Sequence, residues 1–584
     1  MKIDWATDSM DRWNNYLGEI TKFNTYNFTN WAYIDKFTWF SNAANGVFIP
    51  PRAVIEAAHK NGVKILGTIF IDKSTNYSTF ITNSSGNYTA AGKLLAIAKY
   101  YGFDGYIFNM EASTTSTNAT HIKNLMKQIQ TLNVSANTQY YNPNLDISWY
   151  DALRPTGALT YQNQLNANNS AFFNDTTVVS NSFFTNYAWT STGVNNSVTT
   201  AKNLSRSPFD VYMGVDGFDR SGYTTNVANG YIKNKNFMDS FFTTAYTVPK
   251  ISVALYALAN LAYQDMTATG SNQFIYDPAQ WSNYYDSENR FFSGTDLNAT
   301  TTDASGNFKG IGYYVPARTV ITSLPFNTSF NIGQGRVWSV NGAQTTRDWS
   351  DMSKQDILPT WQWAVTGAGS IVPRIDPTVA YNGGSSIKLS GSINNNSNVI
   401  KLYLTKLLLT SKSKFDLTYK AGVAGATNLK LLLYFSDNLT TPVELDLGTA
   451  TNTGWNTKNF DLSSYSGKEI NVIGVKVISS TSVASYQLHL GQFNLYNDSG
   501  TLATIETKQD KVEVYPNPAK EFVTIKLNKE VETKVSIYNS IGQLVLEKIV
   551  KGTQNIDTSK LNKGIYIIQF ENKEVKTSKK LIIK

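Results

Sequence analysis

Residues 50–71 read PPRAVIEAAHKNGVKILGTIFI, and residues 90–111 read AAGKLLAIAKYYGFDGYIFNME. In both stretches apolar residues first recur with helical spacing up to a glycine, Gly62 or Gly102, and a short apolar run follows. Such a run is typical of a strand that is buried on both faces. A helix followed at once by a buried strand, twice in succession, predicts a parallel sheet covered by helices.

Similar apolar runs recur over the first half of the chain. They are WAYIDKF (31–37), ISWYD (147–151), FFTNYAW (183–189), VYMGVD (211–216) and ISVALYAL (251–258). Together with the runs at 63–71 and 103–111 they make seven candidate strands, which alternate with more helical segments. This alternation predicts an α/β fold, a (β/α)8 TIM barrel. We expect the eighth strand in GIGYYVPARTV (310–320) or just before it.

Beyond about residue 345 the pattern changes to strands of period two. The strand-like runs are SSIKLSG (385–391), VIKLYLTKLLL (399–409), KFDLTYKAG (414–422), LKLLLYFSD (429–437), INVIGVKVIS (470–479) and YQLHLGQFNLYN (486–497). With no helix between them, they predict an antiparallel β-sandwich. We therefore expect three domains: the barrel at 1–345, a β-sandwich accessory domain at 346–500, and, after a linker, a small all-β domain at 511–584.

Composition narrows the classes of function. The chain has 584 residues, no cysteine and three scattered histidines, so disulfides, a thiolate nucleophile and a cysteine- or histidine-rich metal site are poor candidates. We expect no metal and no cofactor. The net charge of +8 gathers in the lysine-rich C-terminal segment without a basic stripe interleaved with aromatics, which argues against nucleic acid as a partner.

Two further features concern membranes and export. No run of about 18 or more uncharged apolar residues exists, so we expect no membrane span. The first residues, MKIDWATDSMDRW, lack the apolar core of a signal peptide. If the protein is exported, we expect the signal segment to be absent from this chain.

The candidate chemistry lies at the end of the strand at 103–111, the third in our count. Active sites of (β/α)8 barrels lie at the carboxyl ends of the strands. Period-two alternation places Asn109 and Glu111 on one face and turns Phe108 and Met110 toward the helix layer. A carboxyl group and a carboxamide should therefore share the barrel mouth.

This pair differs from the two carboxylates of most glycosidases. An amide neither attacks an anomeric carbon usefully nor takes a proton, so the nucleophile is expected to be the substrate's own 2-acetamido oxygen, which closes to an oxazoline. Glu111 would be the general acid and base, and Asn109 would hold and polarise the acetamide. The competing interpretation is that the Asn-x-Glu sequence merely caps the following helix.

Several other residues fall near the ends of candidate strands. They are Tyr150, Asn186, Tyr187, Trp189, Asp216 and Arg220. Each alone is more often a packing or capping residue than a catalytic one, but together they would ring one opening. We expect all of them except Tyr150 to bind substrate.

A set of motifs shares its order and spacing with a known family. The motifs are FTNWAYIDKFTWFS (28–41), IPPRAVIEAAHKNGVKILGTI (49–69), GFDGYIFNMEA (102–112), WYDAL (149–153), FFTNYAW (183–189), DVYMGVDGFDR (210–220) and LPFNTSFNIGQG (324–335). Over roughly residues 1 to 345 the chain resembles glycoside hydrolase family 85, the endo-β-N-acetylglucosaminidases, and the similarity continues more faintly into the β-sandwich.

The resemblance implies retaining, substrate-assisted hydrolysis of the GlcNAc-β-1,4-GlcNAc bond in the core of N-linked glycans of glycoproteins, with transglycosylation as an accompanying reaction. It assigns Asn109 and Glu111 the roles given above, and it implies that Tyr150 helps to close the intermediate. The family usually reads WQ where this chain has Tyr161-Gln162, so Tyr161 keeps a substrate-binding aromatic but loses the indole. Ala188 leaves a smaller wall than the family's usual aromatic, which bears on acceptor preference.

The last domain has a resemblance of its own. VEVYPNPAKEFVTIKL (512–527), SIYNSIGQLVLE (536–547) and LNKGIYIIQF (561–570) are similar to the C-terminal sorting domains of type IX secretion. This implies the type IX secretion machinery as a partner, and a secreted or cell-surface protein whose last domain is removed or attached to the surface.

Other functions remain open at this stage. A catalytically silent glycan-binding lectin or adhesin would have no reason to keep a general acid such as Glu111. A chitinase-like hydrolase would carry a DxxDxDxE run, whereas this chain has Asn109 in place of the last Asp. The β-sandwich would bind carbohydrate or buttress the barrel, and we favour the buttress because no aromatic platform is evident in it.

Overall fold

The computed structural model describes two compact units, residues 1–497 and 498–584, which are treated separately below. The described residues are 1–7, 21–23, 27–41, 45–216, 238, 240–243, 248–257, 285, 288–289, 291–293, 310–498, 512–527, 530–539, 542–572 and 576–584. In this part of the chain, none of the helices has the length and apolarity needed to cross a bilayer.

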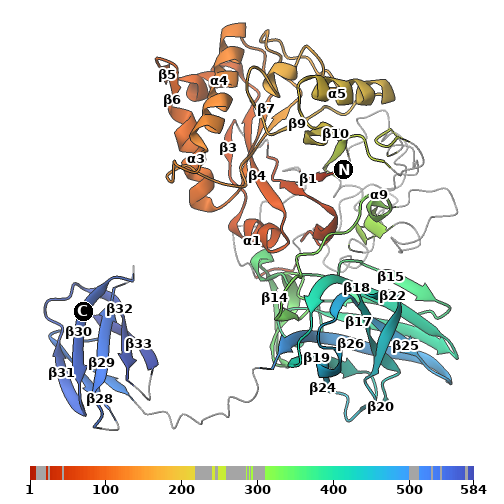
Figure 1. Cartoon of the computed structure of the whole chain (residues 1–584), viewed down its shortest axis with the longest axis vertical. Coiled ribbons are helices and arrows are strands. Elements are labelled where there is room, and N and C mark those ends of the chain that lie inside the picture. The colour runs from red at the N-terminus through yellow and green to blue at the C-terminus, as the bar shows by residue number, and fades with distance from the viewer. Residues whose placement is uncertain are drawn as a thin grey trace. The chain divides into compact units, whose positions relative to one another are not determined.

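Eight parallel strands form a closed barrel in the first unit (Figure 1). They are β1 (Ile3–Ala6), β2 (Lys36–Thr38), β4 (Lys64–Ile71), β7 (Gly105–Met110), β8 (Asp146–Tyr150), β9 (Ser182–Phe184), β10 (Val211–Asp216) and β11 (Ser252–Tyr256). Strand β2 pairs with both β1 and β4, and β1 also pairs with β11, so the ring has no open edge. The prediction of a (β/α)8 barrel is confirmed.

The barrel's first strand is the element that the sequence pattern missed. Strand β1 has only four residues, all buried, which is too few to show a period. The expectation of a strand at 310–320 was wrong, because Ile311–Tyr314 is the short helix α9. Pro316 in this stretch also lacks the N–H that a ladder needs. The strand that carries Asn109 is consequently the fourth of the barrel and not the third.

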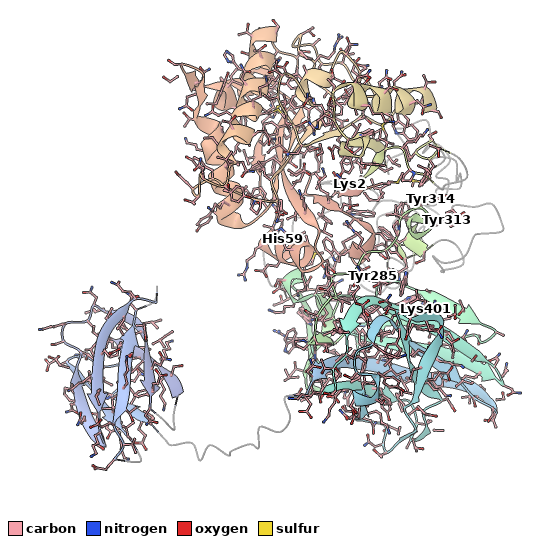
Figure 2. The ribbon with its side chains drawn as sticks, in the orientation of Figure 1. Lys2, His59, Tyr285, Tyr313, Tyr314 and Lys401 are labelled. Atoms are coloured by element: carbon pink, nitrogen blue, oxygen red, sulfur yellow. The ribbon has the colours of Figure 1, made fainter. Side chains whose placement is uncertain are left out.

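Helices lie between several of the barrel strands, including the two that the sequence predicted before β4 and β7. The helices are α1 (Arg52–Lys60), α2 (Tyr77–Ile81), α3 (Thr89–Tyr101), α4 (Ser116–Leu132) and α5 (Ser191–Asn203). Helix α3 ends at Gly102, whose φ of 80° suits glycine and whose N–H donates to Ala98 O at 2.8 Å. His59 in α1 (Figure 2) lies 2.8 Å from Asp104 Oδ2, next to the start of β7, and this hydrogen bond raises the pKa of His59.

Shorter elements decorate the barrel. Strand β3 (Gly46–Phe48) runs antiparallel to β4, β5 (Asn83–Ser84) and β6 (Asn87–Tyr88) form a small hairpin, and Trp31–Tyr33 forms a single 3-10 turn. The turn occupies the first half of the run at 31–37, so the barrel strand there begins only at Lys36.

Two antiparallel sheets complete the first unit and confirm the predicted β-sandwich. One contains β12 (Phe326–Thr328), β16 (Val372–Asp376), β17 (Ser386–Asn394), β19 (Ser413–Ala421), β24 (Trp455–Asp461) and β26 (Ser482–Asn497). The other contains β15 (Ala364–Gly367), β18 (Ser397–Leu408), β21 (Leu429–Phe435), β22 (Asn438–Asp446) and β25 (Glu469–Ile478). Two hairpins, β13 (Gln334–Val340) with β14 (Ala343–Ser350) and β20 (Gly425–Ala426) with β23 (Thr449–Ala450), accompany them.

One apolar core runs from the barrel's helix layer into the sandwich. Trp31 Nε1 donates to Gln355 Oε1 at 2.7 Å across this junction. Because strand β12 already pairs with β26 of the sandwich, the chain joins the sandwich at residues 326–328. The boundary that we placed at residue 345 stays a prediction, and the continuous core supports the buttress interpretation of the sandwich.

The second unit has two small sheets and a core of its own. One sheet contains β27 (Glu513–Tyr515), β28 (Phe522–Lys526) and β31 (Thr553–Asp557), and the other contains β29 (Thr533–Tyr538), β30 (Leu544–Val550), β32 (Gly564–Glu571) and β33 (Lys576–Ile583). The expected all-β character of this segment is confirmed.

Candidate active site

Strand alternation decides which side chains of β7 face the barrel lumen. Ile107 packs in an inner cluster with Tyr150 and Tyr187, whereas Phe108 and Met110 belong to the core behind the strands. Asn109 therefore faces inward, as predicted. In the register of the sheet, Asn109 lies beside Phe70 of β4.

Asn109 is buried with unused hydrogen-bonding capacity. Its side chain is 3% exposed, and its Oδ1 has no hydrogen-bond partner among the residues that the structure describes. Leaving such an acceptor buried without a donor costs about 1–3 kcal/mol. A donor brought by a ligand would remove this cost.

Glu111 lies just beyond the end of the same strand and is partly exposed. Its backbone N–H donates to Ile71 O at 2.7 Å, which continues the ladder with β4 for one more residue. Tyr161 donates its phenolic hydrogen to Glu111 Oε1 at 3.3 Å. The carboxyl group is thus held at the mouth, two residues further along the strand direction than Asn109.

Tyr150 ends the neighbouring strand β8. Its hydroxyl donates to Asn186 Oδ1 at 2.8 Å. Burial raises the pKa of Tyr150 well above its ordinary value, and the charge of Glu111 acts in the same direction. The Tyr150 hydroxyl is therefore protonated at neutral pH, as its hydrogen bond to Asn186 requires.

A chain of aromatic rings runs from Phe70, which lies beside Asn109, to Tyr161, which binds Glu111. We call this chain the aromatic wall. Ring centroids are 6.2 Å apart for Phe70 and Phe40, 5.4 Å for Phe40 and Tyr256, 5.5 Å for Tyr256 and Tyr187, 6.2 Å for Tyr187 and Tyr150, and 6.3 Å for Tyr150 and Tyr161. The sequence reasoning missed Phe40, Phe70 and Tyr256. The position of Phe70, second from the end of its strand, was the available signal.

A glycine makes room for this wall. A Cβ on Gly214 of β10 would lie 2.8 Å from Tyr187 Cδ1 and 2.6 Å from Thr185 O. Both distances are shorter than a normal contact, so the Tyr187 ring can lie against β10 only because residue 214 has no side chain.

Residues 7–338 match the model of glycosyl hydrolase family 85. The chain belongs to this family. Residues 513–584 match the secretion system C-terminal sorting domain. Both resemblances found in the sequence are confirmed.

The curated relatives that this chain matches share about a quarter of the aligned residues with it. The chain is 27% identical over 418 residues to the cytosolic endo-β-N-acetylglucosaminidase of Mus musculus, covering 70% of this chain and 50% of that protein. It is 26% identical over 426 residues to cytosolic endo-β-N-acetylglucosaminidase 1 of Arabidopsis thaliana, covering 70% of this chain and 54% of that protein. The chain thus spans about half the length of the curated relatives that it matches.

A solved structure supports the fold. The glycoside hydrolase domain of Endo-D from Streptococcus pneumoniae R6 superposes with a TM-score of 0.71 at 23% identity, over 100% of this chain and 91% of that one. At this level of identity the likeness shows a shared fold and no more.

The remaining candidates of the family 85 site differ in how they are placed. Asp216 is fully buried at the end of β10, level with Tyr256 in the sheet register. Burial raises the pKa of Tyr187 well above its ordinary value, and the charge of Asp216 adds to this in a smaller degree. Trp189 is not part of the inner cluster: it is 2% exposed, donates to Gly214 O at 2.6 Å and packs against Phe241 in the core behind the strands. Arg220 lies outside the described residues.

At the opposite end of the lumen, where the strands begin, charged groups bind one another. Lys36 Nζ lies 2.8 Å from Ser182 Oγ, 3.5 Å from Asp146 Oδ2 and 3.8 Å from Asp4 Oδ2. Burial raises the pKa of Asp4 to about 6. Burial acts on Asp146 in the same direction, but the charges of Lys36 and Lys64 outweigh it and lower the pKa of Asp146.

In the described parts of the chain, no group of three or more His, Cys, Asp or Glu side chains is arranged to hold a metal ion. The expectation that the chemistry needs no metal or cofactor stays a prediction.

Proposed function

We propose that this family 85 protein is an endo-β-N-acetylglucosaminidase that cuts between the two core N-acetylglucosamines of N-linked glycans. The observation that carries the proposal is the buried Asn109 Oδ1 without a partner among the described residues, two residues before Glu111 at the barrel mouth. Family membership and the names of the curated relatives support the same activity.

In the first step, the acetamide of the substrate is the nucleophile. Asn109 Oδ1 accepts the acetamido N–H, which increases electron density on the acetamide oxygen. That oxygen forms a bond to C1 while the bond from C1 to the leaving oxygen breaks, and Glu111 donates its proton to the leaving oxygen. The products are an oxazolinium ion, whose N–H proton stays hydrogen-bonded to Asn109 Oδ1, and a glycoprotein that keeps one N-acetylglucosamine.

In the second step, Glu111 acts as a base. It takes a proton from water as the water oxygen bonds to C1 and the oxazoline C–O bond opens, so the configuration at C1 is retained. A sugar hydroxyl in place of water gives transglycosylation. Tyr150 is held by Asn186 with its hydroxyl protonated, and we assign it to the closure of the oxazoline.

The aromatic wall has a matching role. Sugar rings present apolar faces that stack on aromatic side chains. Phe70 of β4 lies beside Asn109 in the register of the sheet, and Tyr150 ends β8, on the other side of β7. The rings of Tyr256 and Tyr187 stack at 22°. We assign this wall, with Tyr161, to the sugar that carries the reacting acetamide, and Asp216 to the hydroxyl groups of the same sugar.

The test separates the two catalytic residues by changing the starting point. Asn109→Ala should lose about 10²–10³ in the rate of glycan hydrolysis but still transfer a preformed sugar oxazoline to an N-acetylglucosamine acceptor. Glu111→Ala should be slow on both substrates, because it acts in both steps. Equal loss of both activities in Asn109→Ala would remove its proposed role.

Mass spectrometry of the products identifies the bond that is cut. We expect the glycan to carry one reducing-end N-acetylglucosamine and the protein to keep the other. Release of glycans with both core sugars, leaving aspartate behind, would mean amidase chemistry and would contradict the proposal.

The second unit suggests where the enzyme works. We propose that residues 513–584, which match the sorting domain, direct export to the cell surface or the extracellular space through the type IX machinery, with later removal or surface attachment of this unit. Deleting residues 508–584 should abolish export. Continued export of the truncated chain would refute this role.

A further inference from the structure

The carboxyl group of Asp151 lies one residue beyond Tyr150 and faces away from solvent. It is 1% exposed. Its Oδ2 accepts the backbone N–H groups of Asn163 at 2.7 Å and Gln162 at 3.1 Å, and its Oδ1 accepts from Asn169 Nδ2 at 2.7 Å. Asp151 is the first residue after β8, and it therefore binds three residues, at positions 162, 163 and 169, of the loop that follows this strand.

This loop is a hairpin whose returning strand carries Tyr161. Leu153 and Leu159 form an antiparallel bridge, and Thr160 N donates to Ala152 O at 3.0 Å. Tyr161 follows at once and donates to Glu111 Oε1. The backbone on the far side of Tyr161 is fixed by Asp151, so both neighbours of this tyrosine are anchored.

Asn163 forms a second connection from the same point. Its Oδ1 accepts from Asn186 Nδ2 at 2.7 Å and from Ala188 N at 3.0 Å. Asn186 in turn accepts the hydroxyl hydrogen of Tyr150. Asn163 has a φ of 56°, a left-handed conformation that asparagine tolerates better than most residues.

We propose that Asp151 and Asn163 form a positioning brace with two arms. In one arm, Asp151 fixes the backbone next to Tyr161, so that the Tyr161 hydroxyl binds Glu111. In the other arm, Asn163 fixes the amide of Asn186, so that Asn186 binds the hydroxyl of Tyr150. The proposal rests on the proposed function, because the arms end on the groups assigned to proton transfer and to oxazoline closure. Neither Asp151 nor Asn163 needs to touch the substrate for this.

Burial raises the pKa of Asp151 to about 7, against the hydrogen bonds from Asn169, Gln162 and Asn163. A carboxyl group kept in so unfavourable a place fits a positioning role better than a stabilising one, since a buried charge is weak evidence for stability. The geometry of the two arms carries the inference without it.

The two arms can be cut separately. Asn163→Gly removes the side chain that binds Asn186 but keeps the left-handed backbone and the N–H that binds Asp151. Tyr161→Phe removes only the hydroxyl on Glu111. Asp151→Ala releases both arms. Asn168→Ala is a matched control, because Asn168 lies in the same loop and binds Arg154 and the side-chain oxygen of Gln162, but neither the Gln162 N–H nor Asn163.

The readouts are kcat and KM on a glycoprotein, and the rate with a preformed oxazoline, each corrected for the folded fraction. Asn163→Gly should lower kcat on the glycoprotein about 10- to 100-fold and change oxazoline transfer much less, because closure of the ring is the step that it affects. Tyr161→Phe should lower both activities. Asp151→Ala should show both effects, and Asn168→Ala neither.

Each possible failure points to a different cause. If the unaltered protein neither releases glycan nor uses the oxazoline, the proposed function is wrong. If it is active and Asn163→Gly and Tyr161→Phe match it in kcat, or lose only thermal stability, the brace is wrong while the function stands. Because these two variants change part-exposed side chains, the test holds even if Asp151→Ala does not fold.

Discussion

The two ends of the barrel lumen contain polar groups in opposite states. Where the strands begin, Lys36 lies within 4 Å of Asp4, Asp146 and Ser182, so each charged group has a partner. Where the strands end, Asn109 Oδ1 is buried as deeply but has no partner in the described part of the protein. Burial is similar at the two ends, and satisfaction of hydrogen bonds differs.

This difference separates residues kept for folding from residues kept for chemistry. A buried ionic group with all its partners in place has no capacity left for a ligand, and removing one partner leaves the others uncompensated. A buried acceptor without a donor lowers stability and is of use only when a ligand supplies the donor. Mutations at the two ends should therefore affect different measurements.

The largest effect is expected at the end of the lumen where the strands begin. Lys36→Met removes the charge that compensates Asp4 and Asp146, and the unfolding free energy should fall by about 3–5 kcal/mol. Denaturant unfolding measures this change. Lys2→Met is the control: Lys2 (Figure 2) pairs with Asp210 at 2.9 Å but is 45% exposed, so its loss should cost at most about 1 kcal/mol. If Lys36→Met also lowered the unfolding free energy by at most about 1 kcal/mol, the buried ion cluster would not be structurally important.

At the end of the lumen where the strands finish, we expect a large loss of activity and little loss of stability. Asn109→Ala should reduce glycan hydrolysis about 10²–10³-fold while the unfolding free energy changes by less than about 1 kcal/mol, since no hydrogen bond of Oδ1 within the described residues is lost. Parallel denaturation and kinetic measurements on one preparation test this. A destabilisation as large as that of Lys36→Met would return Asn109 to a structural role.

The pH dependence of stability should reveal Asp4. Its pKa is about 6 when folded and about 3.9 when unfolded. The folded state therefore binds the proton more tightly, and stability falls as pH rises from about 4 to about 6. Asp4→Asn should remove this part of the dependence, on the order of 2–3 kcal/mol across that window. Urea unfolding of both proteins at several pH values gives the difference, and parallel curves would contradict the raised pKa.

The smallest effect is expected from the second unit. Because it has its own core, deleting residues 508–584 should leave kcat/KM on a soluble glycoprotein within about twofold and the Tm of the first unit within about 1 °C. Calorimetry and kinetics of the truncated protein measure both. A large fall in either would mean that the first unit depends on the second.

Sequence reasoning worked where a short-range pattern was enough. Alternation along Phe108, Asn109, Met110 and Glu111 placed the two polar side chains on the lumen face because a strand has a fixed period of two. It failed for Trp189, because the strand β9 ends at Phe184 and the alternation no longer applies beyond it. Phe40, Phe70 and Tyr256 come together only through the register of a closed ring, which no local pattern encodes.

Closure of the ring by β1 has a consequence for synthesis. The backbone N–H of Lys2 binds Ser252 Oγ across 250 positions of sequence, so the first strand made must wait for the last. At about 5–20 residues per second, this wait is about 10–50 s. During that time the edge of β1 that later pairs with β11 is unpaired and open to other chains. The ring can then close before the C-terminal unit has left the ribosome.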